Sequence, residues 1–248
     1  MKKMVVVAVL ALGLVLMSIP AMATRLTSVF DSSWTVLAAE DWVGDNGYVG
    51  PGWGGQAFDA EYLFYKYDKT SRELSIGLQT GFDVQHNPSD TGYTNPGYYA
   101  GDLALSFDDC GDNGWEYGVD FGITGQKDYD GDGIAGMDAG LYTDIVWNND
   151  VYFSDAAPFA IESAYESPET VLITNYAGKI DDSYYRSISF IVPENINIQN
   201  IAASWTMSCG NDVVRGCAPV PEPQTLLLMG IGLLGLAFVG RKKLGERA

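Results

Sequence analysis

The chain has 248 residues and carries 14 Lys and Arg against 32 Asp and Glu, which gives a net charge of −18. Such an excess of negative charge repels nucleic acid and anionic lipid headgroups, attracts cations and excludes the DNA-binding and RNA-binding classes. The length suffices for one domain with a sizeable core, and no internal repeat or second domain is visible.

The amino terminus has the layout of a secretory signal peptide. Lys2 and Lys3 form a charged region, an apolar run covers residues 4–19, and Ala21-Met22-Ala23 supplies the small residues that signal peptidase requires. We therefore expect residues 1–23 to be a signal peptide that is cleaved after Ala23. An uncleaved N-terminal anchor is the alternative.

Between the two ends of the chain, apolar residues alternate with a period of two, which is typical of half-buried strands. The alternation covers residues 73–79, 102–107, 116–121, 186–192 and 201–207. Further runs are strand-like by composition, and they cover residues 33–38, 58–67, 141–147 and 171–176. Asp68 to Arg72 is expected to form a hairpin turn.

These patterns predict an all-β domain over residues 24–218. Because no helical period separates the strands, we expect an antiparallel two-sheet sandwich of the jelly-roll or lectin-like kind. A closed barrel is the structural alternative. A signal helix would precede the domain, and a transmembrane helix would follow it.

The carboxyl terminus has a three-part layout. Pro221-Glu222-Pro223 comes first, an apolar run over 226–239 follows, and Arg241-Lys242-Lys243 closes it. The apolar run is shorter than the roughly 20 residues of a permanent span. By the positive-inside rule, the basic cluster would stay in the cytoplasm and leave the domain outside.

This tail resembles the PEP-CTERM sorting signal of Gram-negative bacteria, in which Pro221-Glu222-Pro223 is the naming motif. The resemblance implies a sorting signal over residues 219–243, with a transmembrane segment at about 225–240 and a cytoplasmic tail over 244–248. It also implies processing by an exosortase, a membrane protease. The middle of the chain, including 74–83 and 205–212, looks like secreted β-sandwich domains found on PEP-CTERM proteins, a group without an established activity.

One loop resembles the first half of a calcium site. Asp128, Asp130 and Asp132 stand at alternate positions, Gly133 permits a tight turn, and Ile134 would offer its carbonyl oxygen. The second half departs from the pattern, since Ala139 occupies the position of the bidentate carboxylate; Asp138, one residue earlier, is the substitute ligand. Calcium is thus the one cofactor predicted, and an acidic solvated turn between two strands is the alternative.

Other acidic residues stand at the ends of predicted strands, where we expect ordinary outward-facing positions. They are Asp59, Glu61, Asp83, Asp102, Asp108 and Asp120.

Two glycine-rich loops, over residues 44–55 and 87–99, hold aromatic residues that could stack on sugar rings. The platform would consist of Trp42, Trp53, Tyr93, Tyr98 and Tyr99. The alternative is that these rings fold back over the open ends of the sandwich.

The cysteines allow one disulfide in an oxidising compartment. Cys209 and Cys217 are the predicted pair because they are close in sequence, and Cys110 with either of them is the alternative. The single histidine, His86, cannot build a triad or a zinc site alone, so we expect no catalytic residues and no enzyme.

The resulting hypothesis is an exported protein of the cell envelope or extracellular matrix. Its processing partners would be signal peptidase and exosortase, and its C-terminal helix would anchor it in the membrane until the tail is processed. A calcium-dependent carbohydrate-binding or adhesion module that contacts extracellular polysaccharide is the alternative. A secreted glycan-active enzyme is a weaker alternative.

Overall fold

The computed structural model describes residues 24–39, 55–85, 98–111, 114–122, 139–163 and 172–220. Within these ranges the chain forms antiparallel strands and two short 3-10 helices, η1 (Gly55–Phe58) and η2 (Ser154–Ala156). The prediction of an all-β antiparallel fold is confirmed. The finer assignment to a jelly-roll or lectin-like arrangement stays a prediction.

The first sheet has the strand order β1-β2-β3-β10-β9. Its strands are β1 (Thr35–Ala39), β2 (Ala60–Asp68), β3 (Glu73–Thr80), β10 (Ser183–Ile191) and β9 (Leu172–Ile180). The predicted turn after Asp68 is confirmed, because β2 and β3 pair antiparallel with Asp68 opposite Glu73. The register of this pair shifts between Ala60 and Tyr62, which leaves Glu61 on a β-bulge.

The second sheet has the order β12-β11-β4-β5-β6. Its strands are β12 (Val213–Pro219), β11 (Asn200–Thr206), β4 (Leu103–Ser106), β5 (Tyr117–Asp120) and β6 (Gly140–Tyr142). A separate ribbon pairs β7 (Val146–Asn148) with β8 (Ala160–Ser163). The predicted strand over 141–147 is therefore two strands in different sheets, and β8 and β12 were not anticipated.

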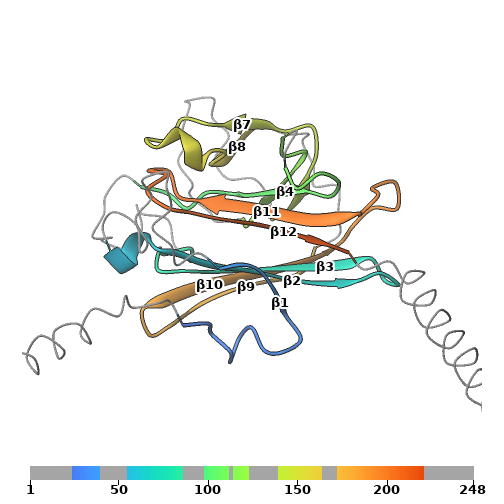
Figure 1. The fold of residues 1–248 in the computed structure, drawn as a ribbon, viewed down its shortest axis with the longest axis horizontal. Coiled ribbons are helices and arrows are strands. Elements are labelled where there is room, and N and C mark those ends of the chain that lie inside the picture. The colour runs from blue at the N-terminus through green and yellow to red at the C-terminus, as the bar shows by residue number, and fades with distance from the viewer. Residues whose placement is uncertain are drawn as a thin grey trace, which may run out of the picture.

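The two large sheets lie face to face, and the β7–β8 ribbon covers the outer side of the second sheet (Figure 1). The core fills the space between the sheets with the alternating residues that the sequence predicted. These include Leu74, Ile76 and Leu78 of β3 and Leu103 and Leu105 of β4, all without exposed surface. Burial of this apolar surface is the main driving force of the fold.

The amino-terminal segment covers the outer side of the first sheet (Figure 1). Its Phe30 ring is fully buried and stacks on Phe64 at a centroid distance of 4.2 Å. Gly77 of β3 lies beneath this ring, and a β-carbon there would come within 2.3 Å of Phe30. The absence of a side chain at Gly77 thus allows the segment to dock.

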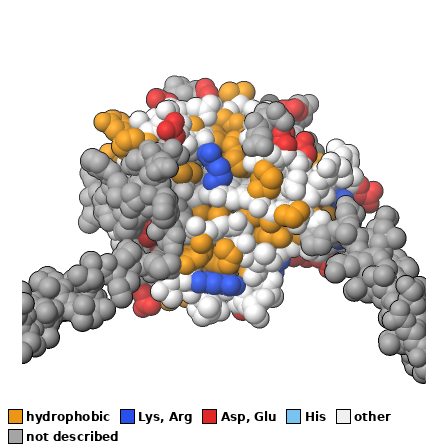
Figure 2. Space-filling model, in the orientation of Figure 1, with side chains coloured by type: hydrophobic (Ala, Val, Ile, Leu, Met, Phe, Trp, Pro, Cys, Tyr) orange, Lys and Arg blue, Asp and Glu red, His pale blue; other side chains and the backbone are white. Residues whose placement is uncertain are grey.

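The two sheets approach each other closely where β12 passes β1. A β-carbon on Gly216 would lie 2.3 Å from the Leu37 carbonyl oxygen, so only glycine fits this crossing. On the face shown in Figure 2, hydrophobic side chains occupy much of the centre, whereas Asp and Glu gather toward the margins.

The disulfide differs from the predicted Cys209–Cys217 pair. Cys110 and Cys217 form the bond, with their Cα atoms 5.4 Å apart, and Cys209 is a buried free thiol. Cys209 stands in the turn after β11, whereas Cys217 lies four residues into β12, about 13 Å from its start at 3.3 Å per residue. The extended strand thus carries Cys217 away from the turn that holds Cys209, so closeness in the sequence does not bring the two side chains together.

Candidate functional site

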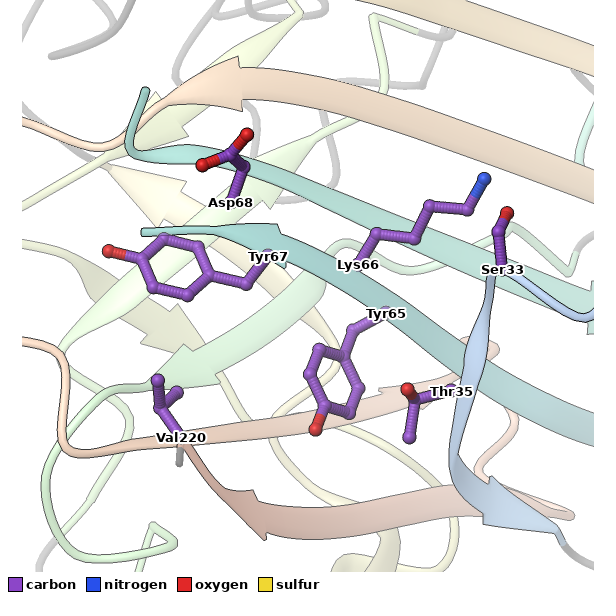
Figure 3. Close-up of a pocket in the computed structure, with 7 residues that line it drawn as sticks. All are labelled: Ser33, Thr35, Tyr65, Lys66, Tyr67, Asp68 and Val220. Carbon is purple, nitrogen blue, oxygen red and sulfur yellow. The ribbon is translucent and has the colours of Figure 1, made fainter. Parts of the chain in front are cut away.

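A groove opens at the side of the first sheet, next to the point where the described chain ends (Figure 3). It has a volume of about 380 Å³. The lining residues are Ser33, Thr35, Tyr65, Lys66, Tyr67, Asp68 and Val220. Val220 is the last described residue and directly precedes Pro221, so the described part of the domain ends at this groove.

Strand geometry determines which side chains enter the groove. Tyr65 and Tyr67 are two residues apart on β2, so both rings project to the same side, toward Val220 (Figure 3). Lys66 projects to the opposite side, where its Nζ lies 4.4 Å from the centroid of the Trp34 ring. The groove therefore offers two aromatic rings and hydroxyl groups, a combination that suits a sugar or another polar ligand with apolar faces.

A cluster of carboxylates lies at the other end of β2, where the bulge directs Glu61 away from solvent. Glu61 has no exposed surface. Its Oε1 accepts hydrogen bonds from Gln56 Nε2 at 2.6 Å and from Ser183 Oγ at 2.7 Å, and Gln79 Nε2 donates to Oε2. All of these partners donate to the carboxylate; burial raises the pKa of Glu61, and these hydrogen bonds offset part of the rise.

Asp59 and Asp212 complete this cluster, and both are buried. Asp212 accepts the Ala60 backbone N–H at 2.8 Å and the Val213 backbone N–H at 2.9 Å. Burial raises the pKa of Asp59 to about 7, and the neighbouring charges of Glu61 and Asp212 add to the rise. The expectation of outward-facing carboxylates is wrong here.

Asp83, Asp102 and Asp120 are buried as well, so the same expectation fails for them. Asp102 accepts the Ile161 backbone N–H at 2.8 Å and so fixes the β7–β8 ribbon to the second sheet. Asp83 and Asp120 lie near Arg186, whose pKa is lowered to about 10 by burial and partly restored by these two charges. These three carboxylates have structural roles.

A second group of three carboxylates, the exposed triad, consists of Asp108, Asp109 and Glu116. Their oxygen atoms lie within 4.8 Å of one another, so the triad could hold a cation. Asp108 and Glu116 are exposed, and Asp109 is half-buried. Ser106 Oγ lies 3.1 Å from Asp108 Oδ1 and 3.2 Å from Asp109 Oδ1. Asp108 is the one member of the predicted outward-facing set that is exposed.

Most of the predicted site residues lie outside the described residues. These are the cleavage residues Ala21 and Ala23, the motif Pro221-Glu222-Pro223, the calcium ligands Asp128, Asp130, Asp132, Ile134 and Asp138, and the aromatic residues Trp42, Trp53 and Tyr93. The structure does show that the calcium-like stretch connects β5 and β6, which pair with Asp120 opposite Gly140.

Two residues of the predicted aromatic platform are described. Tyr98 is 41% exposed, and its ring packs edge-on against Phe58 at a centroid distance of 5.7 Å. Tyr99 is held by its backbone, because its N–H donates to Ser208 Oγ at 2.9 Å. Tyr98 thus keeps accessible surface at the end of the first sheet.

The comparison with protein families concerns the tail that starts beside the groove. Residues 219–243 match the PEP-CTERM protein-sorting motif. The chain carries a PEP-CTERM sorting motif. The resemblance of the tail to that signal is confirmed with the predicted bounds. No curated protein and no solved structure gives a significant match to the chain.

The PEP-CTERM motif implies an exported, envelope-sorted protein that is processed by an exosortase. The motif begins at Pro219, the last residue of β12, so the fold ends where the sorting signal starts. Among the described residues, no helix is long and apolar enough to cross a membrane. The predicted span at about 225–240 lies outside those residues.

Sequence reasoning did not single out Tyr65, Tyr67, Gln79 or Asp212 as site residues. The two tyrosines could have been paired from the sequence, because residues two apart on a strand share a face. Asp212 could not have been found in this way, because its contact with the Ala60 backbone spans 152 positions of the sequence.

Proposed function

We propose that this chain is a non-catalytic β-sandwich protein of the cell envelope or extracellular matrix. Signal peptidase would cleave after Ala23, and the apolar run over 226–239 would hold the domain at the membrane until an exosortase processes the tail. The observation that carries this proposal is the PEP-CTERM motif, which follows the last strand of the domain without a linker.

Cell fractionation tests the proposal. The full chain and a chain that ends at Val220 would be expressed in a bacterium that has an exosortase and in the same strain without it. We expect a shortened, envelope-associated form only for the full chain in the exosortase strain, because the tail is the sorting signal. Equal size and equal distribution of both chains in both strains would contradict the proposal.

A second candidate function is binding of extracellular polysaccharide, and the tyrosine groove favours it. Tyr65 and Tyr67 present rings on one side of β2, where Thr35 lies next to Tyr65, whereas Ser33 lies beside Lys66. Stacking of sugar rings on such side chains contributes to carbohydrate affinity. In this function the aromatic residues predicted in the two loops would provide further rings for stacking on sugars.

Affinity electrophoresis through gels that contain purified polysaccharides tests this second function. We expect the mature protein to be retarded and Tyr67→Ala to lose the retardation. Tyr152→Ala is the matched control, since Tyr152 is 83% exposed but does not line the groove. Equal mobility of all three proteins in every gel would exclude the binding function.

Calcium binding over residues 128–138 stays part of the proposal for this adhesive role. Alternate carboxylates in a glycine-containing loop supply the hard oxygen ligands that calcium prefers. The loop connects β5 and β6, and an ion bound there would stabilise the folded domain by mass action.

A further inference from the structure

The buried Glu61 carboxylate is bonded only by neutral donors among the described residues. The amide nitrogens of Gln56 and Gln79 and the hydroxyl of Ser183 donate to its oxygens. A buried anion is costly to the fold unless a positive charge lies nearby. Burial raises the pKa of Glu61, so a cation beside it would favour the ionised form of this carboxyl group.

Gln79 connects this carboxylate to the first residues of the described chain. Its Nε2, which donates to Glu61, also donates to the Thr24 carbonyl oxygen at 2.8 Å. Its Oε1 accepts the Leu26 backbone N–H at 2.9 Å. The Gln79 side-chain amide thus bonds to the Thr24 carbonyl oxygen, to the Leu26 N–H and to Glu61, and so connects the start of the segment to this carboxylate.

The nearest basic residue of this segment is engaged elsewhere. Arg25 donates from Nε to the Phe30 carbonyl oxygen at 2.9 Å and from Nη2 to the Asp31 carbonyl oxygen, and its guanidinium lies 5.1 Å from the Phe64 ring centroid. Arg25 therefore stabilises the segment itself and does not bond to Glu61.

Cleavage after Ala23 would change the charge at this place. Hydrolysis of the Ala23–Thr24 peptide bond adds one water, leaves a carboxylate on Ala23 and creates an amino group on Thr24. Near neutral pH that group is largely an ammonium, with an ordinary pKa of about 7.7–8.0. A neutral amide nitrogen is thereby replaced by a cation beside Gln79.

We propose that Glu61, with Gln79 as its bridge, is the binding site for the α-ammonium group that signal-peptide cleavage creates on Thr24. This inference rests on the predicted cleavage after Ala23. The site recognises a primary ammonium at the start of a chain, which is a known mode of terminus recognition. Its consequence is that the folded domain gains a compensating charge only after export and processing.

The test measures the acid–base behaviour of the new amino group. The full chain would be exported from a bacterial host, purified in its processed form, and its first residue determined by sequencing. Labelling of the α-amine with an acylating reagent would then be followed by mass spectrometry across a pH series. An anion near an ammonium raises the pKa of the ammonium, so we expect about tenfold slower labelling near neutral pH than for an unperturbed amine.

Two controls complete the design. Glu61→Gln should restore ordinary labelling, whereas Glu194→Gln should not. Glu194 is exposed and follows Pro193, whose carbonyl oxygen accepts from Arg72, so it lies near the opposite end of β3 from Gln79. Should Glu61→Gln fail to fold, wild-type protein labelled in denaturing urea supplies the same reference value.

The first residue tests the cleavage position, and the labelling rate tests the ammonium site. A first residue other than Thr24 would overturn the cleavage position and the ammonium site together. A Thr24 terminus whose labelling is the same in the folded wild type, in Glu61→Gln and in urea would overturn the ammonium site alone.

Discussion

Two groups of three carboxylates differ in what compensates their charge. In the buried cluster, Glu61, Asp59 and Asp212 have at most 4% exposed surface, and protein donors replace water around Glu61 and Asp212. In the exposed triad, Asp108 and Glu116 face solvent, and Ser106 is a shared neighbour of Asp108 and Asp109. Water screens the exposed charges, whereas the fold itself must stabilise the buried ones.

The acidic residues of this protein therefore fall into two classes, exposed carboxylates and buried carboxylates. Exposed carboxylates give the chain its surface charge, and their removal changes stability little. Buried carboxylates bind backbone and side-chain donors at the ends of strands, and they define where segments distant in sequence meet. Substitutions in the two groups should therefore change stability by different amounts.

Removal of the disulfide beside the exposed triad should have the largest effect. Cys110 and Cys217 are 107 positions apart, so their bond restricts the unfolded chain strongly. We expect Cys110→Ser with Cys217→Ser to lower the free energy of unfolding by about 4 kcal/mol. Urea unfolding of the oxidised protein measures this value. An effect no larger than that of Cys209→Ser, which removes a free thiol, would contradict the expectation.

Truncation of Glu61 should rank second. Glu61→Ala leaves the donors of Gln56, Gln79 and Ser183 without their acceptor, so we expect a loss of about 3 kcal/mol of stability. Asp108→Ala is the matched control in the exposed triad, with an expected loss of less than about 0.5 kcal/mol. Equal losses in urea unfolding would remove the distinction between the two groups.

The pH dependence of stability should reveal Asp59. Its pKa is about 7 in the folded protein and 3.8 for an unperturbed Asp, so between these two pH values the folded state binds more protons than the unfolded state. The stability that Asp59 contributes is therefore fully present below the unfolded-state pKa and is lost as pH rises through the folded-state pKa. The total loss in the free energy of unfolding should be roughly 2–4 kcal/mol.

Urea unfolding at a series of pH values checks this dependence. Asp59→Asn should flatten the decline, because an amide does not titrate in this range. Asp108→Asn should leave the decline unchanged. A wild-type stability that rises between about pH 5 and about pH 7 would show that Asp59 is not the dominant group.

Calcium should give the smallest effect and should distinguish two acidic regions. If the ion binds at the predicted loop, added calcium should raise the melting temperature of the wild type and of Asp109→Asn, but not of Asp130→Asn. A stabilisation of about 1–3 kcal/mol corresponds to calcium well above its dissociation constant. Loss of the effect in Asp109→Asn instead would assign the ion to the exposed triad.

The strands with regular alternation, the turn after Asp68 and the sorting motif could all be predicted from the sequence alone. Each of these depends on residues that are neighbours in the chain. The period of two places Leu74, Ile76 and Leu78 on one face, whatever the rest of the fold does. The motif over 219–243 is likewise a local pattern, and it matched with the predicted bounds.

The pairing of the cysteines, the burial of the carboxylates and the position of the groove depend on contacts between distant segments, and only the tertiary structure shows them. Cys110 meets Cys217 because β12 runs along β11 beside β4, an order that alternation does not encode. Glu61 is buried because a one-residue bulge redirects its side chain and because Gln56, Gln79 and Ser183, the last 122 positions away, surround it. Local pattern sets which face a residue takes, and only the packing of distant segments sets what covers that face.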